Sequence, residues 1–287
     1  NNLYAGGNGV VIHERFDPGA VLSDFGKYNV SVFYGVPTMY SFLLDTYDPS
    51  LHDVSKIRLG VVGAAPVPVH VMREMEAKFG MTIVEGFGMT ESCGAGAIER
   101  LDRERKPGSC GNPVPGLEVK IVDDDDKEVT RGEEGEIIIR GPITMKGYWE
   151  MPEATAETFR NGWLHTGDIG RMDEEDYLYI VDRLKDMIIT GGFNIYPKEI
   201  EDVIYSHPAV LESTVIGVPD PSKGELTKAY IVLKEGESAT EEDMDAFCRE
   251  KLAAYKIPRM YEFRDQPLPK NPQGKILKRV LRDELKT

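Results

Sequence analysis

A glycine-broken loop, GFGMTES at residues 86–92, follows a short apolar run and combines a hydroxyl with a carboxylate. Its two glycines permit a tight backbone turn beside a ligand. Phe87 offers a flat ring for stacking on a base, and Thr90 and Glu91 are residue types that can hold a phosphate and its magnesium ion. Taken alone, this pattern is more typical of a strand-to-helix turn.

Three more positions carry polar groups suited to nucleotide chemistry. Asp168 stands in a predicted Thr-Gly-Asp turn, where a carboxylate can accept hydrogen bonds from ribose hydroxyls. Arg183 follows a predicted strand and can reach the same sugar or a phosphate. Lys275 ends a Pro/Asn/Gly-rich loop and supplies a compact positive charge. Individually, Asp168 is more typical of a structural turn, Arg183 of an ion pair with Asp182 or Asp186, and Lys275 of a surface loop.

Composition excludes several classes of protein. The net charge of −15 argues against a general nucleic-acid binder, which needs a basic surface to neutralise phosphates. No apolar run approaches the roughly 20 residues that span a bilayer. No Walker A, Rossmann or nucleophile-elbow motif is present in the sequence. Three scattered cysteines indicate neither a disulfide framework nor a zinc site, so a cytoplasmic location is expected.

The first third of the chain alternates strand and helix patterns. Buried strands are predicted at 30–35, 57–63 and 81–85, and helices at 37–47 and 70–80. This alternation predicts βαβ units in a parallel sheet.

The pattern changes at about residue 107. Short strands separated by Gly and Asp turns predict a small antiparallel subdomain, in which the DDDD run at 123–126 is a hairpin tip rather than a metal site. After residue 185, a helix opening at Pro197 and a capping box from Thr240 to Asp243 predict a compact α/β unit of about a hundred residues.

The order in which the motifs occur along the chain identifies a family more specifically than any single motif does. In chain order they are YGVPTMY, GAAP, GFGMTES, GNPVPGLEVKIVD, WLHTGDIG, YIVDRLKDMIITGGFNIYPKEIE and PKNPQGKILKR. This series, spread over nearly the whole chain, resembles the adenylate-forming enzymes: acyl- and aryl-CoA synthetases, firefly luciferase and the adenylation domains of peptide synthetases. The stretches VFYGVPTMY, KGYWEMPEATAETF and VIGVPDPSKGE are most similar to medium- and long-chain fatty acyl-CoA ligases.

The resemblance implies an α/β fold in two parts. Residues 1–184 would form the later part of a large AMP-binding domain, with a βαβ sheet and a small β-rich subdomain. Residues 185–287 would form a small, mobile α+β lid, with its hinge near Lys185. The family's lysine-containing phosphate loop would lie upstream of residue 1. The chain is therefore expected to be the C-terminal portion of a longer protein, whose N-terminal half is missing from this sequence.

The resemblance also assigns site residues by position. Lys275 would be the catalytic lysine and Glu91 the magnesium ligand. Gly191 and Gly192 would guide the pantetheine arm of coenzyme A. The contacts to ATP or AMP would come from Gly63, Ala64, Ala65, Gly86, Phe87, Gly88, Met89, Thr90, Asp168 and Arg183. The family commonly has Tyr at the position of Phe87, which keeps the ring and loses a hydroxyl.

The implied reaction joins a fatty carboxylate to coenzyme A at the expense of ATP, through an acyl-adenylate, with magnesium as the metal. Two alternatives stay open. The chain as it stands could be a folded but inert fragment, because the phosphate loop is missing from it. The substrate could also be another carboxylate, such as an aryl, malonyl or other acyl acid.

Overall fold

The structure is a computed structural model, and it describes residues 9–63, 67, 69–271 and 275–285. The chain divides into two compact units. Unit 1 comprises residues 1–118, 140–152 and 175–179, and unit 2 comprises residues 119–139, 153–174 and 180–287. Each unit mixes helices with sheets, which confirms the expected α/β class.

Unit 1 is built on a sheet whose order is β1-β2-β3-β4-β5. Strands β1 (Val32–Gly35), β2 (Leu59–Val62) and β3 (Thr82–Phe87) run parallel, which confirms the predicted parallel sheet. Two short strands, β4 (Ala97–Ile98) and β5 (Asn112–Pro113), continue it in antiparallel fashion.

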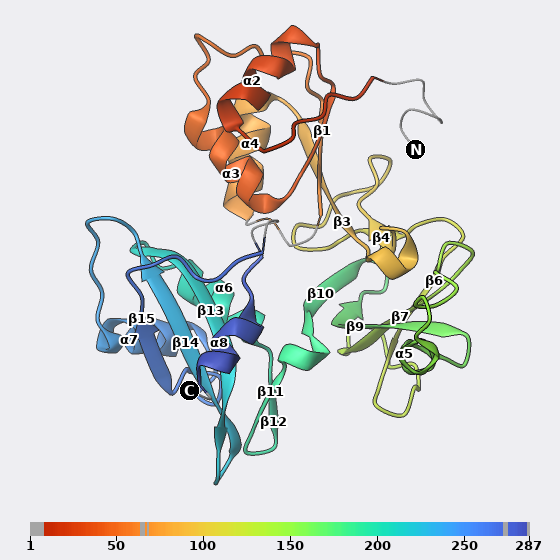
Figure 1. Cartoon of the computed structure of the whole chain (residues 1–287), viewed down its shortest axis with the longest axis vertical. Coiled ribbons are helices and arrows are strands. Elements are labelled where there is room, and N and C mark those ends of the chain that lie inside the picture. Colours follow the sequence, from red (N-terminus) through yellow and green to blue (C-terminus); the bar gives the residue numbers. More distant parts are fainter. Residues whose placement is uncertain (1–8, 64–66, 68, 272–274, 286–287) are drawn as a thin grey trace. The chain divides into compact units, whose positions relative to one another are not determined.

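Three helices pack beside this sheet: α2 (Pro18–Lys27), α3 (Pro37–Thr46) and α4 (Val69–Phe79) (Figure 1). Proline opens α2 and α3, where its missing N–H costs nothing. Their apolar faces and the sheet share one core, which includes Leu22, Phe25, Tyr40, Leu43, Met75 and Ile83. Burial of these side chains is the main force that holds unit 1 together.

Two strands differ from their predictions. The β1 strand was expected to be buried, but Tyr34 is 57% exposed, because β1 is the edge strand of the sheet. The β3 strand runs two residues beyond its predicted end, because Gly86 and Phe87 pair with Ile98 and Ala97 of β4. The predicted loop GFGMTES therefore begins inside a strand.

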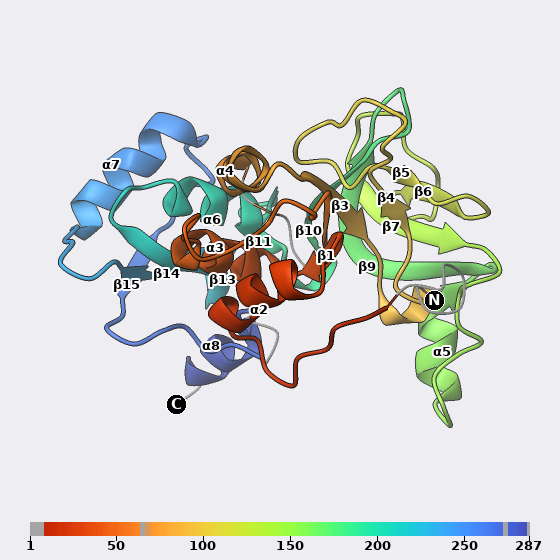
Figure 2. The ribbon, with the colours of Figure 1, turned by 90° about the horizontal axis from the view of Figure 1, so that it is seen from above.

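The predicted β-rich subdomain is a second sheet with the order β10-β9-β7-β6. Its members are β6 (Glu118–Val122), β7 (Gly135–Arg140), β9 (Trp163–Met172) and β10 (Leu178–Arg183) (Figure 2). β7 and β9 are antiparallel, as predicted. Helix α5 (Pro152–Thr158) leads into β8 (Phe159–Arg160), which forms a hairpin with β9.

Unit 2 also contains a third sheet, with the order β12-β11-β14-β13. Its strands are β11 (Ile188–Thr190), β12 (Phe193–Ile195), β13 (Val210–Asp220), β14 (Gly224–Leu233) and β15 (Met260–Phe263). β13 and β14 form a long antiparallel hairpin, and β15 pairs with β14 in parallel.

Helices α6 (Pro197–Tyr205) and α7 (Glu241–Lys251) contribute to the core of the third sheet, and α8 (Lys278–Glu284) ends the described chain. The core includes Ile188, Ile195, Ile200, Ile204, Met244 and Cys248. The predicted capping box of α7 is present: the Thr240 hydroxyl accepts from the Asp243 N–H at 3.2 Å, and the Thr240 N–H donates to the Asp243 carboxylate at 2.9 Å.

The predicted domain boundary near Lys185 stays a prediction, since the two compact units divide the chain by a different criterion. In the part of the chain that the structure describes, no helix has both the length and the apolar character needed to cross a membrane.

Candidate active site

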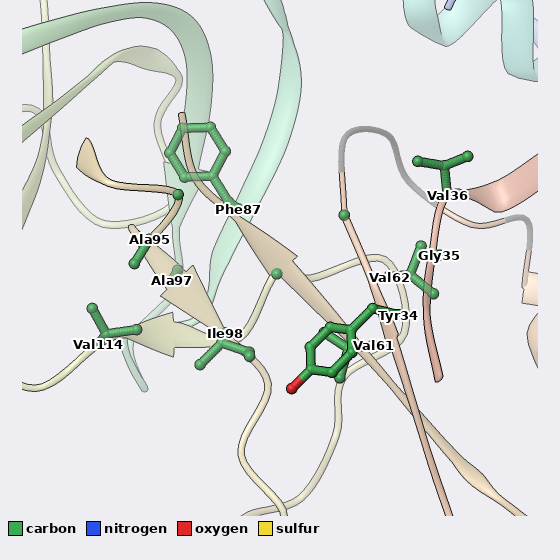
Figure 3. A pocket seen from close by; sticks show the side chains of 13 residues that line it. Tyr34, Gly35, Val36, Val61, Val62, Phe87, Ala95, Ala97, Ile98 and Val114 are labelled. Carbon is green, nitrogen blue, oxygen red and sulfur yellow. The ribbon is translucent and has the colours of Figure 1, made fainter. Parts of the chain in front are cut away.

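A pocket of about 310 Å³ lies at the end of β3 in unit 1. Figure 3 shows Tyr34, Val61 and Val62 on one side of it and Ala97, Ile98 and Val114 on the other, with the ring of Phe87 beside them. Glycines complete the wall: Gly35, Gly63, Gly86 and Gly94. None of the residues described around the pocket carries a charge. The pocket therefore suits an apolar or aromatic group.

The loop after β3 is held in a tight turn. A side chain on Gly88 would meet the carbonyl oxygen of Gly94 at 2.4 Å, so glycine is needed there. Residues Thr90–Ser92 form a single 3-10 turn, in which the N–H of Cys93 donates to the carbonyl of Thr90 at 3.0 Å. This turn leaves Thr90 exposed and Glu91 half-buried.

Glu91 is fixed at both its backbone and its side chain. Its carbonyl oxygen accepts from the N–H of Met145 at 2.7 Å. Its carboxylate oxygen Oε1 accepts from the hydroxyl of Tyr148 at 2.8 Å. Sequence reasoning did not single out Tyr148, although the KGYWE stretch was recognised, because no local pattern links two residues 57 positions apart.

Val67 is attached to β3 through a buried carboxylate. The N–H of Val67 donates to Oε1 of Glu85 at 2.6 Å. Glu85 in turn lies beside Glu99, whose Oε2 accepts from the Glu85 N–H at 3.0 Å. Burial raises the pKa of Glu99 to about 7; the Glu85 N–H opposes this rise and the Glu85 carboxylate adds to it. Two further predicted contacts, Ala64 and Ala65, lie outside the described residues.

Asp168, Arg183 and Lys275 form a charged cluster in unit 2. The Arg183 Nε lies 3.2 Å from Oδ1 of Asp168, which is only 9% exposed. Burial raises the pKa of Asp168, while the positive charges of Arg183, Lys275 and Lys185 hold it down. The structure thus brings together the carboxylate, the guanidinium and the lysine that the sequence placed in one site.

Asp168 does not lie in a turn between strands, as the sequence predicted, but within β9. The strand departs from regular pairing here: Gly167 has a φ of +67°, and the β7–β9 register shifts between Glu136 and Ile138. The Glu136 carboxylate stabilises this bulge, because it accepts from the Gly167 N–H at 3.0 Å and lies 2.8 Å from the His165 ring. Bulges commonly re-aim a side chain beside an active site.

Two hydrogen bonds join Lys275 to Asn271. The Lys275 N–H donates to Oδ1 of Asn271, and the Asn271 N–H donates to the Lys275 carbonyl oxygen, both at 2.9 Å. The Lys275 side chain is exposed, yet desolvation by nearby protein atoms lowers its pKa, and the Arg183 guanidinium lowers it further. The Asp168 carboxylate opposes these effects.

The remaining predicted residues lie near the start of the third sheet. Lys185 occupies a short turn, Leu184–Asp186, and Arg282 of α8 pairs with Asp186 at 2.8 Å. Gly191 and Gly192 form the two-residue turn between β11 and β12, with φ values of +55° and +85°. Positive φ at both positions is the geometry of a tight hairpin turn that favours glycine.

The residues fit a magnesium ion that is held largely by its nucleotide. In the described ranges, no three His, Cys, Asp or Glu side chains are grouped so that they could hold a metal by themselves. Magnesium typically takes one or two carboxylates and completes its shell with substrate phosphates and water. Glu91, held in place beside the exposed Thr90 hydroxyl, matches that requirement.

The chain is similar in sequence to known proteins. The chain is 45% identical to a long-chain-fatty-acid–CoA ligase of Escherichia coli O157:H7, over 97% of this chain and 49% of that protein. It is 43% identical to a feruloyl-CoA synthase of Amycolatopsis, over 96% of this chain and 56% of that protein. The chain thus spans about half the length of the curated relatives it matches.

Solved structures also resemble this chain. ATP-bound MatB from Rhodopseudomonas palustris superposes with a TM-score of 0.88 at 39% identity, covering 96% of this chain and 54% of that one. The o-succinylbenzoate CoA synthetase of Bacillus subtilis, in complex with ATP and magnesium, gives 0.85 at 38% identity, covering 98% and 56%.

Two family models match the sequence. The model of the AMP-binding enzyme covers residues 2–149, and that of the AMP-binding enzyme C-terminal domain covers residues 199–275. The chain belongs to the AMP-binding enzyme family.

Proposed function

We propose that this chain supplies part of an acyl-CoA ligase that activates a fatty carboxylate with ATP and transfers the acyl group to coenzyme A. The observation that carries the proposal is the uncharged pocket at the end of β3, which continues into the turn that holds Glu91. An acyl chain beside Tyr34, Val61 and Ile98 would leave the part of the wall formed by Gly63, Gly86 and Phe87 to the nucleotide base.

The chain's own residues would act by position and charge. Phe87 and the backbone at Gly63, Gly86 and Gly88 would contact the nucleotide base, with Met89 nearby and Thr90 on the phosphate. Asp168 would accept from the ribose hydroxyls, with Arg183 fixing its carboxylate. A magnesium ion on Glu91 would neutralise phosphate charge. Fixed groups of this kind stabilise developing charge without reorganisation.

Lys275 would act in the first step, in which the carboxylate attacks the α-phosphorus and pyrophosphate leaves. Its ammonium can bridge carboxylate and phosphate oxygens. In the second step the thiol of coenzyme A attacks the acyl carbon and AMP leaves. A rotation about Lys185 would exchange the Lys275 loop for the Gly191–Gly192 turn, as lid motions do in many enzymes.

An aryl carboxylate is the second candidate, since the feruloyl-CoA synthase is nearly as similar as the fatty-acid ligase. Pyrophosphate release by the full-length protein, measured with octanoate, palmitate, ferulate and malonate, separates the classes. We expect the fatty acids to be activated fastest. A preference for malonate would contradict the proposal, because a second carboxylate has no cationic partner among the described pocket residues.

A further inference from the structure

Tyr148 reaches Glu91 from a segment that the proposed function does not otherwise use. Its hydroxyl donates to Oε1 of Glu91 at 2.8 Å, and the neighbouring Met145 N–H donates to the Glu91 carbonyl at 2.7 Å. Both contacts lie within unit 1. One short segment therefore fixes the backbone and the side chain of the same residue.

Hydrogen bonds within residues 141–151 hold this segment in place. The Thr144 hydroxyl donates to the carbonyl of Gly141 at 2.8 Å, and the Met151 N–H donates to the Tyr148 carbonyl at 3.3 Å. Strand β7 leads into it, and its last residue Arg140 pairs with Glu118. A phenol on such a support loses little conformational entropy when it forms its hydrogen bond.

The hydrogen bond leaves the carboxylate able to bind a metal. An ionised carboxylate has about four lone pairs, and a phenol donor uses one of them. A free glutamate side chain samples several rotamers, whereas one tied at Oε1 presents its other oxygen in a fixed direction. Groups that orient a ligating carboxylate in this way tune the affinity of a metal site.

We propose that Tyr148 is a positioning residue that orients Glu91 toward the magnesium ion of the bound nucleotide. This inference rests on the proposed role of Glu91 as metal ligand. It gives the KGYWE stretch a function in the first half-reaction, in which Tyr148 acts through the Glu91 side chain.

Metal binding can be measured without turnover. Mn²⁺ serves as a paramagnetic probe for the full-length protein in the presence of α,β-methylene-ATP, a non-hydrolysable nucleotide. We expect Tyr148→Phe to weaken Mn²⁺ binding about 10-fold, the lower end of the effect of losing a group that orients a metal ligand. In steady-state adenylation, the same variant should need about 10-fold more Mg²⁺ for half-maximal rate and recover most of its kcat at saturating Mg²⁺.

Tyr177→Phe is the matched control. The Tyr177 hydroxyl also donates within unit 1, to the carbonyl of Glu104 at 2.5 Å. This variant should lose comparable thermal stability and keep the wild-type affinity for Mn²⁺. In a Glu91→Gln background, Tyr148→Phe should add no further loss of metal affinity.

The proposal is overturned if Tyr148→Phe binds Mn²⁺ as tightly as the wild type, or if the wild type with nucleotide binds no Mn²⁺. Failure of the proposed function would look different: the wild type would bind Mn²⁺ and nucleotide, and Tyr148→Phe would weaken that binding, yet no carboxylate would release pyrophosphate.

Discussion

The guanidinium Nε of Arg183 lies 3.2 Å from Oδ1 of Asp168, so an arginine at the end of β10 fixes a nearly buried carboxylate on β9. Desolvation makes this carboxylate costly to ionise and raises its pKa, and the surrounding cations offset only part of that cost. A buried carboxylate whose orientation is fixed is well suited to accept hydrogen bonds from a pair of hydroxyl groups.

Asp168→Asn should weaken AMP binding by about 10- to 100-fold, because hydrogen bonds to a charged acceptor contribute more than those to a neutral one. The loss should be confined to ribose recognition. Calorimetric titration with AMP and with 2′,3′-dideoxy-AMP tests this: the wild type should prefer AMP strongly, and the variant should lose that preference. Glu262→Gln, which removes the ion pairs of Glu262 with Lys228 and Arg264 in unit 2, is the control. An unchanged preference for AMP in Asp168→Asn would contradict the assignment.

Lys275→Ala should reduce pyrophosphate release by the full-length protein by roughly 100-fold or more, the size of effect seen when one stabilising group is removed from a transition state. Thioester formation from pre-made acyl-adenylate should stay within a few-fold of the wild type, because the lysine acts in the first step only. Lys270→Ala is a control in the same loop, since it breaks an ion pair with Glu212 but leaves Lys275 in place. Equal loss of both half-reactions would show that Lys275 does not have this role.

Glu99→Gln should make the protein more stable at alkaline pH. Burial raises the pKa of Glu99 to about 7, above its value in the unfolded chain. At low pH the Glu99 carboxyl is neutral in both states, so its burial then costs the folded protein no charge desolvation. This advantage is lost as the pH rises through 7, because the carboxylate must then ionise beside the negative charges of Glu85 and Glu76, which the positive charge of Arg105 counters only in part. The contribution at stake is on the order of 3 kcal/mol.

Thermal unfolding at pH 5 and at pH 8.5 tests the effect. Glu99→Gln should unfold at a clearly higher temperature than the wild type at pH 8.5, by roughly 5 °C. The difference should shrink at pH 5. Glu74→Gln, which alters an exposed carboxylate paired with Lys78 in the same unit, should show no such trend. A Glu99→Gln variant that is less stable than the wild type at pH 8.5 would rule out this account.

Thr240→Ala should destabilise the third sheet and its helices by about 1 kcal/mol, since it removes the capping hydrogen bond at the start of α7. Urea unfolding should show a lower midpoint with an unchanged slope. Ser238→Ala, two residues earlier at an exposed position, should change the free energy of unfolding by less than about 0.5 kcal/mol. Equal effects of the two substitutions would mean that the cap contributes nothing measurable.

The sequence by itself determined the features that depend on neighbours a few residues apart. The starts of α3 and α6 at Pro37 and Pro197, and the capping box at Thr240, follow from local backbone chemistry. Motif order also predicted the family, which the comparisons confirmed, and placed Asp168, Arg183 and Lys275 in one site. The roles of these residues stay predictions.

Only the tertiary structure decided contacts between segments far apart in the chain. It placed Asp168 in a bulge of β9, joined Tyr148 to Glu91 across 57 positions, and set Glu85 against Glu99 in a buried pair. The physical reason is that these contacts depend on strand register and on packing, which bring residues together regardless of sequence spacing. Local structural propensity depends on adjacent residues. The pKa of Glu99 and the orientation of the Glu91 side chain depend instead on residues that folding places next to them, such as Glu85 and Tyr148.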